Sequence, residues 1–259
     1  MERISAASNE KIKYAAALAS SASKRRENGE FLLEGARICA DAAENGVAVV
    51  RAFFTGEALG SYSSYISKIE AVCRECYEIS PQAARRLSST DSTQGVFCVC
   101  RAGVSSFSLK PGGVYLALEN IQDPSNIGAI CRSAEAVGID GLIISGGCDI
   151  HNPKALRAAM GSSLRIPIMT TDSLISYIRK AEGFTSLACV PAADAGDIRE
   201  ISREFPRGGI ICCIGNEGNG LTHELIAACD RRITIPMKGK AESLNASAAA
   251  AIIVWELKR

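Results

Sequence analysis

Three glycines stand directly after a short apolar run near the end of the chain. Gly215, Gly218 and Gly220 follow residues 210–214, which form a candidate buried strand. Glycine permits positive φ and lets a ligand approach the main chain closely, so the arrangement is typical of a binding loop. The order is G-x-x-G-x-G and no G-K-S/T follows, which disfavours a nucleoside polyphosphate as ligand. A tight strand-to-helix turn without a ligand is the alternative explanation.

Two further stretches downstream place polar groups beside backbone turns. Residues 235–237 (Ile-Pro-Met) end a second apolar run, and residues 242–245 (Glu-Ser-Leu-Asn) precede an Ala-rich stretch. We expect Ser243 to be the N-cap of a last helix over residues 244–257, with the Asn245 amide facing the glycine loop. The alanines would let other backbone pack close to this helix, although they also suit a plain helix in a crowded core.

An amide and a guanidinium stand six residues apart upstream, at Asn126 and Arg132. The surrounding pattern predicts a strand over residues 114–118, a polar loop, and a helix that begins near Asp123 and stops at Gly138. Open α/β sheets bind ligands at the carboxyl ends of their strands, which is where this placement puts both groups. An Asn helix cap and an Arg paired with a neighbouring carboxylate are the alternative.

Together these stretches resemble the three motifs of the SpoU (TrmH-type) ribose methyltransferases of the SPOUT superfamily. The first is Asp-Pro-x-Asn-x-Gly-x-x-x-Arg-Ser-Ala at 123–134, and the second is Gly-Asn-Glu-Gly-Asn-Gly-Leu at 215–221 with Ile-Pro-Met after it. The third is Glu-Ser-Leu-Asn-Ala-Ser at 242–247, and the order is that of the family. A family signature written R-A-S-x-G-A is also similar to residues 157–162, where Ala159 replaces the serine.

The resemblance implies an α/β fold in which an open parallel sheet has its C-terminal segment threaded as a deep trefoil knot, against the general rule that chains do not knot. It also implies a homodimer, with S-adenosylmethionine bound in the knot loops and no metal. The residues implied to bind this methyl donor are Gly215, Asn216, Glu217, Gly218, Ile235, Pro236, Met237, Ser243, Leu244 and Asn245. Those implied to act in catalysis are Asn126, Arg132, Glu217, Ser243 and Asn245.

The implied reaction moves a methyl group from a sulfonium to a ribose 2′-hydroxyl, a weak nucleophile that must lose its proton. The family's activity is thought to depend on the residue at the position of Arg132. A guanidinium stays protonated and has no lone pair to offer, so we expect Arg132 to bind a substrate phosphate and stabilise the developing alkoxide rather than act as a base. Asn126, Ser243 and Asn245 would orient the ribose or the donor, and Glu217 would steady the loop or the partner subunit.

RNA is the expected substrate because its 2′-hydroxyl distinguishes it from DNA. By family analogy, the presence of an N-terminal substrate-binding domain indicates ribosomal RNA of the large subunit as the substrate rather than transfer RNA. Three alternatives stand beside this reading: a transfer-RNA ribose methyltransferase, an RNA-binding or ribosome-assembly factor without turnover, and a nucleotide-dependent oxidoreductase. The missing G-x-G-x-x-G disfavours the last of these.

The elements that must position these groups have a parallel α/β pattern. Apolar runs at 114–118 and 142–144 suit strands that are buried on both faces. Further units are expected, so that the sheet has about six strands; they are helix 153–160, strand 166–169, helix 174–180 and strand 186–190. We expect an RNA substrate-binding domain over residues 1–101, a linker rich in Gly, Ser and Pro over 102–113, and the methyltransferase domain over 114–259.

The first hundred residues predict a small α/β domain, with helices within 8–45 and strands at 47–55, 71–79 and 96–100. The runs Phe-Leu-Leu-Glu-Gly at 31–35 and Ser-Thr-Gln-Gly-Val at 92–96 resemble the substrate-binding domain often fused ahead of the SpoU domain, which is similar to a ribosomal-protein-type RNA-binding fold. The cations at 24–26 are expected on a loop, where a solvated charge run is the alternative to phosphate contact. The candidate RNA contacts are Lys11, Lys13, Lys24, Arg25 and Arg26, together with Arg132.

The composition is that of an ordinary globular chain, with 259 residues, 47% hydrophobic residues, 22% charged residues and a formal net charge of +1. Charge alone therefore does not indicate a nucleic-acid partner. The sequence shows neither a secretory signal nor an apolar run long enough to span a bilayer, so we expect a cytoplasmic protein. Most of the 11 cysteines lie in apolar runs, and Cys73-x-x-Cys76 has no second pair, so no metal site is expected.

Overall fold

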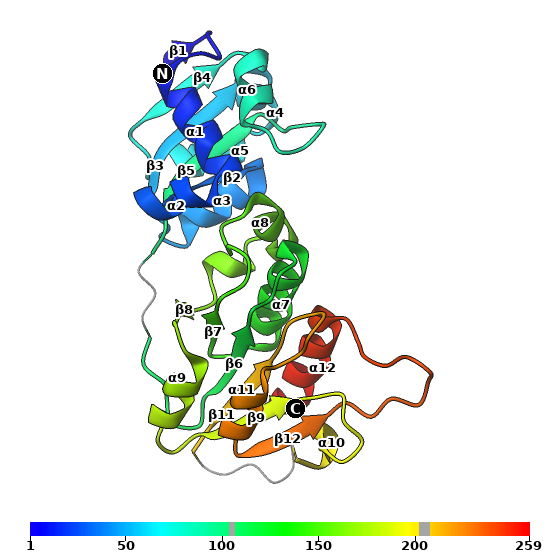
Figure 1. The fold of residues 1–259 in the computed structure, drawn as a ribbon. Coiled ribbons are helices and arrows are strands. Elements are labelled where there is room, and N and C mark those ends of the chain that lie inside the picture. Colours follow the sequence, from blue (N-terminus) through cyan, green and yellow to red (C-terminus); the bar gives the residue numbers. More distant parts are fainter. Residues whose placement is uncertain (104–106, 202–207) are drawn as a thin grey trace. The chain divides into compact units, whose positions relative to one another are not determined.

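The computed structural model describes residues 1–103, 107–201 and 208–259. The chain forms two compact units (Figure 1), one made of Met1–Val104 with His151–Leu164 and the other of Ser105–Ile150 with Arg165–Arg259. Residues 104–106 of the predicted linker lie outside the described residues. The segment 151–164 thus interrupts the second unit in sequence and packs with the first.

The first unit is built on a five-stranded mixed sheet with the order β1-β4-β3-β5-β2. Its strands are β1 (Glu2–Ile4), β2 (Glu30–Glu34), β3 (Val49–Thr55), β4 (Cys76–Ile79) and β5 (Val96–Arg101). Its helices are α1 (Glu10–Ser20), α2 (Ala22–Asn28), α3 (Ala36–Glu44), α4 (Gly56–Ser61), α5 (Ser63–Glu70), α6 (Pro81–Leu87) and α8 (Pro153–Ala159), followed by a 3₁₀ turn at Ser162–Leu164. The expected small α/β domain is confirmed, and β1 and β2 are strands that the sequence did not predict.

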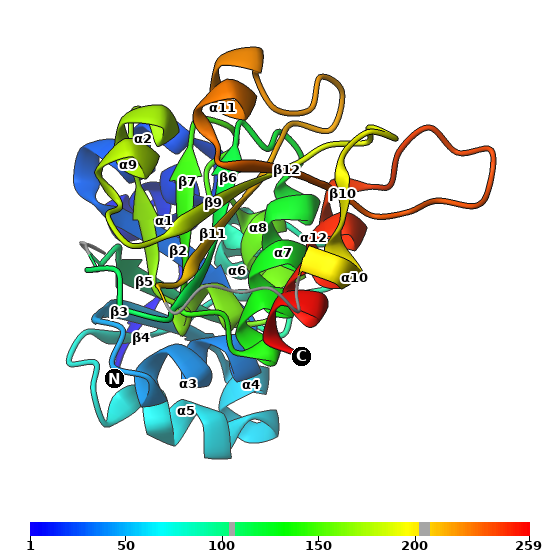
Figure 2. The same cartoon turned by 90° about the horizontal axis from the view of Figure 1, so that it is seen from below.

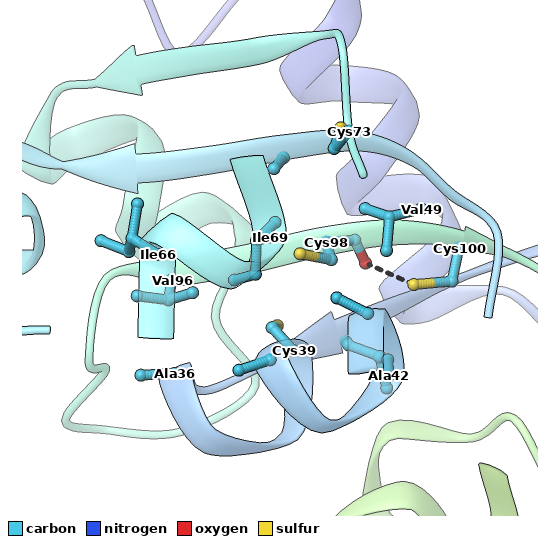
Figure 3. Packing of buried hydrophobic residues seen from close by; sticks show 14 of the residues in the cluster. Ala36, Cys39, Ala42, Val49, Ile66, Ile69, Cys73, Val96, Cys98 and Cys100 are labelled. Carbon is cyan, nitrogen blue, oxygen red and sulfur yellow. Dashed lines mark hydrogen bonds between the residues drawn. The ribbon is translucent and has the colours of Figure 1, made fainter. Parts of the chain in front are cut away.

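Successive side chains along each strand point to opposite faces of this sheet, and each face packs into its own core. Phe53 and Val99 face the core beneath α1 and α6, whereas Phe54 and Cys98 face the core beneath α3 and α5. Figure 3 shows Cys39, Cys98 and Cys100 packed among aliphatic side chains in the second of these cores. Burial raises the pKa of the Cys98 and Cys100 thiols well above the ordinary value, so these cysteines pack as small neutral hydrophobes, as the sequence predicted.

The cations at 24–26 lie within helix α2, so their predicted placement on a loop is wrong. Ser21 begins this helix, because its side chain accepts a hydrogen bond from the Lys24 N–H. Arg25 is buried, and its guanidinium donates to the carbonyl of Leu18 at 2.6 Å and to that of Ala19 at 3.3 Å. These carbonyls belong to the last turn of α1, where a cation is stabilising. Arg25 therefore joins two helices, and its buried guanidinium is already bonded to the protein.

The second unit contains a fully parallel sheet of seven strands with the order β10-β12-β9-β11-β6-β7-β8. Its strands are β6 (Val114–Glu119), β7 (Gly141–Ser145), β8 (Ile168–Thr170), β9 (Thr185–Cys189), β10 (Gly196–Asp197), β11 (Ile210–Ile214) and β12 (Arg231–Thr234). Its helices are α7 (Pro124–Val137), α9 (Leu174–Lys180), α10 (Ile198–Ile201), α11 (His223–Ala228) and α12 (Ala246–Lys258). The open parallel sheet is confirmed; the two-residue β10 is too short to leave a sequence signal.

Helices cover both faces of this sheet (Figures 1 and 2), with α9 and α11 on one side and α7 beside α12 on the other. Helix α7 begins and ends where the sequence predicted. The Asp123 side chain caps its first turn, and Gly138 ends it in a left-handed conformation. Strand β6 lies between β7 and β11, so the loops that follow β6 and β11 emerge side by side.

The end of the predicted linker packs onto the second unit. Phe107 stacks on Tyr115 with ring centroids 5.5 Å apart, and the Tyr115 hydroxyl accepts a hydrogen bond from the Lys110 N–H. Within the described ranges, no helix combines the length and the apolar character needed to cross a membrane.

Arg25→Ala should lower the free energy of unfolding by about 2 kcal/mol, because it removes a buried charged donor from two helix carbonyls. The matched control is Arg26→Ala, which changes the exposed neighbour in the same helix and should stay within about 0.5 kcal/mol of wild type. Urea unfolding followed by circular dichroism measures both. Equal stability of the two variants would contradict a structural role for Arg25.

Candidate active site

A carboxylate from the glycine loop holds the start of helix α7. Glu217 follows β11, and its side chain accepts hydrogen bonds from the Gln122 N–H at 3.0 Å and the Asp123 N–H at 3.1 Å. It also accepts from the side-chain amide of Asn126 at 2.8 Å. One carboxylate therefore fixes the loop after β6 and the first turn of α7 together.

Asn126 is also hydrogen-bonded to the start of the last helix, α12. The Asn245 amide donates to the Asn126 Oδ1 at 3.0 Å, and its own Oδ1 accepts from the N–H groups of Ser247 and Ala248. Asn245 is thus the N-cap of α12. The prediction that Ser243 occupies this position is wrong; Ser243 lies two residues before the cap. Glu217, Asn126 and Asn245 form one continuous hydrogen-bonded chain, which joins all three sequence motifs.

This chain fixes the ionisation state of Glu217. Burial alone would raise the pKa of its carboxyl, but the hydrogen bonds from the Asn126 amide and from backbone N–H groups outweigh burial and hold the pKa below the ordinary value of 4.5. Since a carboxylate only accepts hydrogen bonds, Asn126 must present its amide nitrogen to Glu217 and its oxygen to Asn245. The charge therefore sets the orientation of both amides.

The glycine loop is a compact turn closed on itself. Asn216 and Gly220 exchange two backbone hydrogen bonds of 3.0 Å and 2.9 Å, and the Asn216 side chain accepts from the N–H of Gly218 and donates to the carbonyl of Asn120. A Cβ on Gly215 would overlap the backbone at Gly220 and the next residue. Glycine is therefore required at 215 by close backbone approach, as the sequence suggested.

A cavity of about 410 Å³ lies against this turn. Eight of the residues predicted to bind the donor line it, namely Gly215, Asn216, Glu217, Gly218, Ile235, Met237, Ser243 and Leu244. Twelve further residues also line it, although the sequence did not predict that they bind the donor: Cys189, Val190, Pro191, Ile214, Asn219, Gly220, Leu221, His223, Ile226, Thr234, Ala246 and Ala249. Two predicted donor-binding residues, Pro236 and Asn245, are not among the lining residues; Asn245 acts through the α12 cap and Asn126 instead.

Part of this cavity wall comes from a helix that the sequence did not reveal. Helix α11 supplies His223 and Ile226, and Thr222 caps its first turn. The Thr222 N–H and hydroxyl both donate to Glu119 at the end of β6, at 2.7 Å and 2.8 Å. Thr222 and Glu224 are an N-terminal helix signal, but a helix of six residues is too short for a clear periodicity.

The character of the lining indicates what the cavity can hold. Its size suits a small organic ligand. Aliphatic residues and the residues of the glycine loop line it, and of the described residues that line it none is Lys or Arg. A phosphate-bearing nucleotide would lack a counter-charge here, whereas an apolar heterocycle read by backbone groups and a cationic centre near Glu217 would both be accommodated.

Arg132 lies on α7, exposed, about 9 Å along the helix axis from Asn126. Within the part of the chain that the structure describes, its guanidinium has no hydrogen-bond or ion-pair partner. The alternative of an Arg paired with a nearby carboxylate is therefore wrong for the isolated chain. The guanidinium is available to a ligand.

The N-terminal candidates for RNA contact are partly engaged already. Lys13 pairs with Glu10 at 2.7 Å and Lys24 with Glu27 at 2.8 Å. The Lys11 ammonium lies over the Tyr77 ring, 4.9 Å from its centroid. Arg26 is exposed. Surface pairs of this kind are weak, so Lys11, Lys13, Lys24 and Arg26 remain predicted contacts.

With this geometry established, comparison with known proteins identifies the class. Residues 113–255 match the model of the SpoU rRNA methylase family, and residues 9–98 match the MRM3-like substrate binding domain. The first match covers more than half of the chain and contains all three motifs. The chain therefore belongs to the SpoU rRNA methylase family.

Particular relatives support this assignment. The chain is 29% identical to the 23S rRNA (guanosine(2553)-2′-O)-methyltransferase RlmP of Bacillus subtilis, over 100% of both chains. It is 30% identical to the 23S rRNA (uridine(2479)-2′-O)-methyltransferase of Streptomyces viridochromogenes, over 94% of this chain and 87% of the relative. The solved structure of an AdoMet-bound rRNA methyltransferase from Sinorhizobium meliloti is similar with a TM-score of 0.88 and 27% identity, covering 99% of this chain and 97% of that one.

Glu217→Gln should lower the free energy of unfolding by about 1 kcal/mol at pH 7, because a neutral amide cannot accept all three hydrogen bonds; exposure of the carboxylate keeps the effect small. The folded-state pKa is lowered, so the contribution of the charge is complete above pH 4.5 and is lost as the pH falls through that lowered pKa. The difference between the two proteins should therefore shrink below pH 4.5.

Urea unfolding at several pH values measures this difference. Glu224→Gln is the control, since Glu224 is exposed in the neighbouring helix α11 and should change stability by less than about 0.5 kcal/mol. A Glu217→Gln effect that stayed constant into the acid range would show that the charge is not what holds the loops.

Proposed function

We propose that the chain transfers a methyl group from S-adenosylmethionine to the 2′-hydroxyl of a ribose in 23S ribosomal RNA, and that it does so in the cytoplasm. Membership of the SpoU family and the names of the full-length relatives support this reaction. The observation that carries it is the hydrogen-bonded chain from Glu217 through Asn126 to Asn245 beside the cavity, since it brings the three motifs to one place.

The cavity fits the methyl donor. When bound, S-adenosylmethionine supplies an electrophilic methyl group on a sulfonium. Backbone groups around Gly215, Ile235 and Leu244 would hold its adenine and ribose, and the aliphatic lining would take the purine faces. Glu217 would complement the positive charge of the donor while its loop is held by Asn126. Ser243, at the cavity wall, is placed to orient the methionine end or the incoming ribose.

Arg132 is proposed to position the substrate. The guanidinium is exposed and without a protein partner among the described residues. It would bind a phosphate beside the target ribose and stabilise the alkoxide as the hydroxyl loses its proton. The phosphate oxygen is then the group that accepts the proton.

Three other functions were open from the sequence. A transfer-RNA substrate is disfavoured because two relatives that cover 94% or more of this chain are named for 23S rRNA. A binding factor without turnover is disfavoured because Asn126, Glu217 and Asn245 keep their mutual hydrogen bonds. A nucleotide-dependent oxidoreductase is disfavoured by a cavity whose described lining has no cation for a pyrophosphate.

A homodimer is the proposed assembly. Trp255 and Ile252 lie one turn apart on α12 with 62% and 39% of their surface exposed. Large apolar groups gathered on one helix face mark an interaction surface, and aromatic residues are enriched in such interfaces. A second copy of the chain would cover this face.

The function is tested by transfer of labelled methyl from S-adenosylmethionine to unmodified ribosomal and transfer RNA, followed by alkaline hydrolysis. Alkali cleaves through the 2′-hydroxyl, so label in resistant dinucleotides identifies ribose methylation. We expect it from 23S rRNA only. Label in mononucleotides, or no label in any RNA, would refute the proposal.

Arg132→Ala should lower the turnover rate roughly 100- to 1000-fold. Arg132→Lys should turn over almost as slowly, since lysine lacks the bidentate fork of the guanidinium.

Trp255→Glu should convert the protein to monomers, because a charge would be placed in the apolar subunit contact. Trp255→Phe is the control and should keep the wild-type mass. Sedimentation velocity over a range of concentrations measures both. A wild-type protein that sedimented as a monomer throughout would refute the assembly.

A further inference from the structure

One segment of the catalytic unit is exposed along its whole length. Each residue from Pro236 to Asn245 is exposed to solvent. In both Figure 1 and Figure 2 the chain between β12 and α12, coloured orange to red, extends away from the rest of its unit. We refer to residues 236–245 as the exposed loop.

Both ends of the exposed loop meet the donor cavity. Met237 lines the cavity at one end, and Ser243 and Leu244 line it at the other. The second end is fixed, because Asn245 caps α12 and bonds to Asn126. What binds to the middle of the loop is therefore held at a set distance from the methyl donor.

The middle of the exposed loop carries Lys238 and Lys240. Among residues 1–103, 107–201 and 208–259, neither ammonium has a hydrogen-bond or ion-pair partner. This contrasts with Lys13 and Lys24, which are both in ion pairs. Neither lysine lines the cavity, so the pair is not needed to bind the donor.

We propose that Lys238 and Lys240 bind phosphates of the substrate RNA next to the nucleotide that is methylated. The inference rests on the proposed function and adds the residues that position the substrate. Lys238 directly follows Met237 of the cavity wall, with Cα atoms about 3.8 Å apart. A phosphate held by these side chains therefore places the neighbouring ribose at the cavity mouth. Arg132 would hold the phosphodiester from α7.

Charge favours RNA over a second copy of the chain as the occupant of the exposed loop. Subunit interfaces are depleted in lysine, whereas backbone phosphates are contacted chiefly by lysine and arginine. The apolar face of α12 around Trp255 is a separate surface with the opposite character. Two cations on a projecting loop suit a flexible polyanion better than an apolar protein face.

The test compares wild type, K238A/K240A and the charge-preserving K238R/K240R as full-length proteins, with an unmodified 23S rRNA transcript as the probe. RNA binding is measured across a range of KCl concentrations. For the double alanine variant we expect roughly tenfold weaker binding near physiological salt, and a log–log salt slope smaller by about 1.4 to 1.8, since two phosphate contacts are lost. The arginine variant should keep the wild-type slope.

Three controls separate the outcomes. S-adenosylmethionine affinity, measured by calorimetry, should stay within about twofold of wild type in every variant. Lys180→Ala, an exposed lysine on α9 of the same unit, should leave the slope unchanged. Light scattering reports the oligomeric state, and a double alanine variant that changed its mass but not its RNA affinity would make the loop a subunit contact and overturn the proposal.

An unchanged salt slope in K238A/K240A would overturn it as well. Failure of the proposed function has a different signature, namely no methyl transfer by wild type to any RNA. The salt slope is measured without turnover, so it decides the role of the two lysines in either case.

Discussion

The carboxylate of Glu217 is the interaction on which the site depends. Asn126 is polar and almost fully buried, with 7% of its surface exposed, so both ends of its amide must find partners. Its nitrogen donates a hydrogen bond to Glu217, and its oxygen accepts one from Asn245, across sequence separations of 91 and 119 residues. Loss of Glu217 or Asn245 leaves one end of this buried amide unpaired, so three distant loops are held in place as a unit.

The parallel sheet is what makes this chain of hydrogen bonds possible. Strands β6 and β11 are neighbours, and in a parallel sheet their following loops leave from the same edge. Glu119 at the end of β6 then fixes Thr222 at the start of α11, which supplies part of the cavity wall. The glycine loop lies between these anchors and lines the cavity, and the two backbone hydrogen bonds between Asn216 and Gly220 hold its shape.

Sequence alone predicted the parts whose causes are local. Asp123 and Gly138 mark the ends of α7 because helix caps act within one turn. The glycine at 215 likewise predicts a close approach of the backbone, which the structure has. The pairing of Glu217 with Asn126 left no local signal, since its partners are far apart in the chain. The sequence predicts a loop at residues 24–26, whereas they lie in helix α2. Three adjacent cations give no sign that one of them is buried against the end of the preceding helix. The prediction of Ser243 as the cap is wrong because Asn245, two residues further on, is an equally good capping residue. The seventh strand is a two-residue bridge, and the trefoil knot stays a prediction from the family likeness.

Residues 151–164, between β7 and β8, belong to the first unit, so the two units are not independent modules in the sequence. Leu156 of α8 is buried in a core of the first unit, and His151 stacks on Phe31 with ring centroids 4.4 Å apart. The chain therefore passes between the units three times, not once as in a simple tandem fusion. An excised catalytic half would keep α8 without the surface that buries it, and a transplanted N-terminal half would lack a helix that completes its core. The two halves can be exchanged between relatives only if this segment is exchanged together with the first of them.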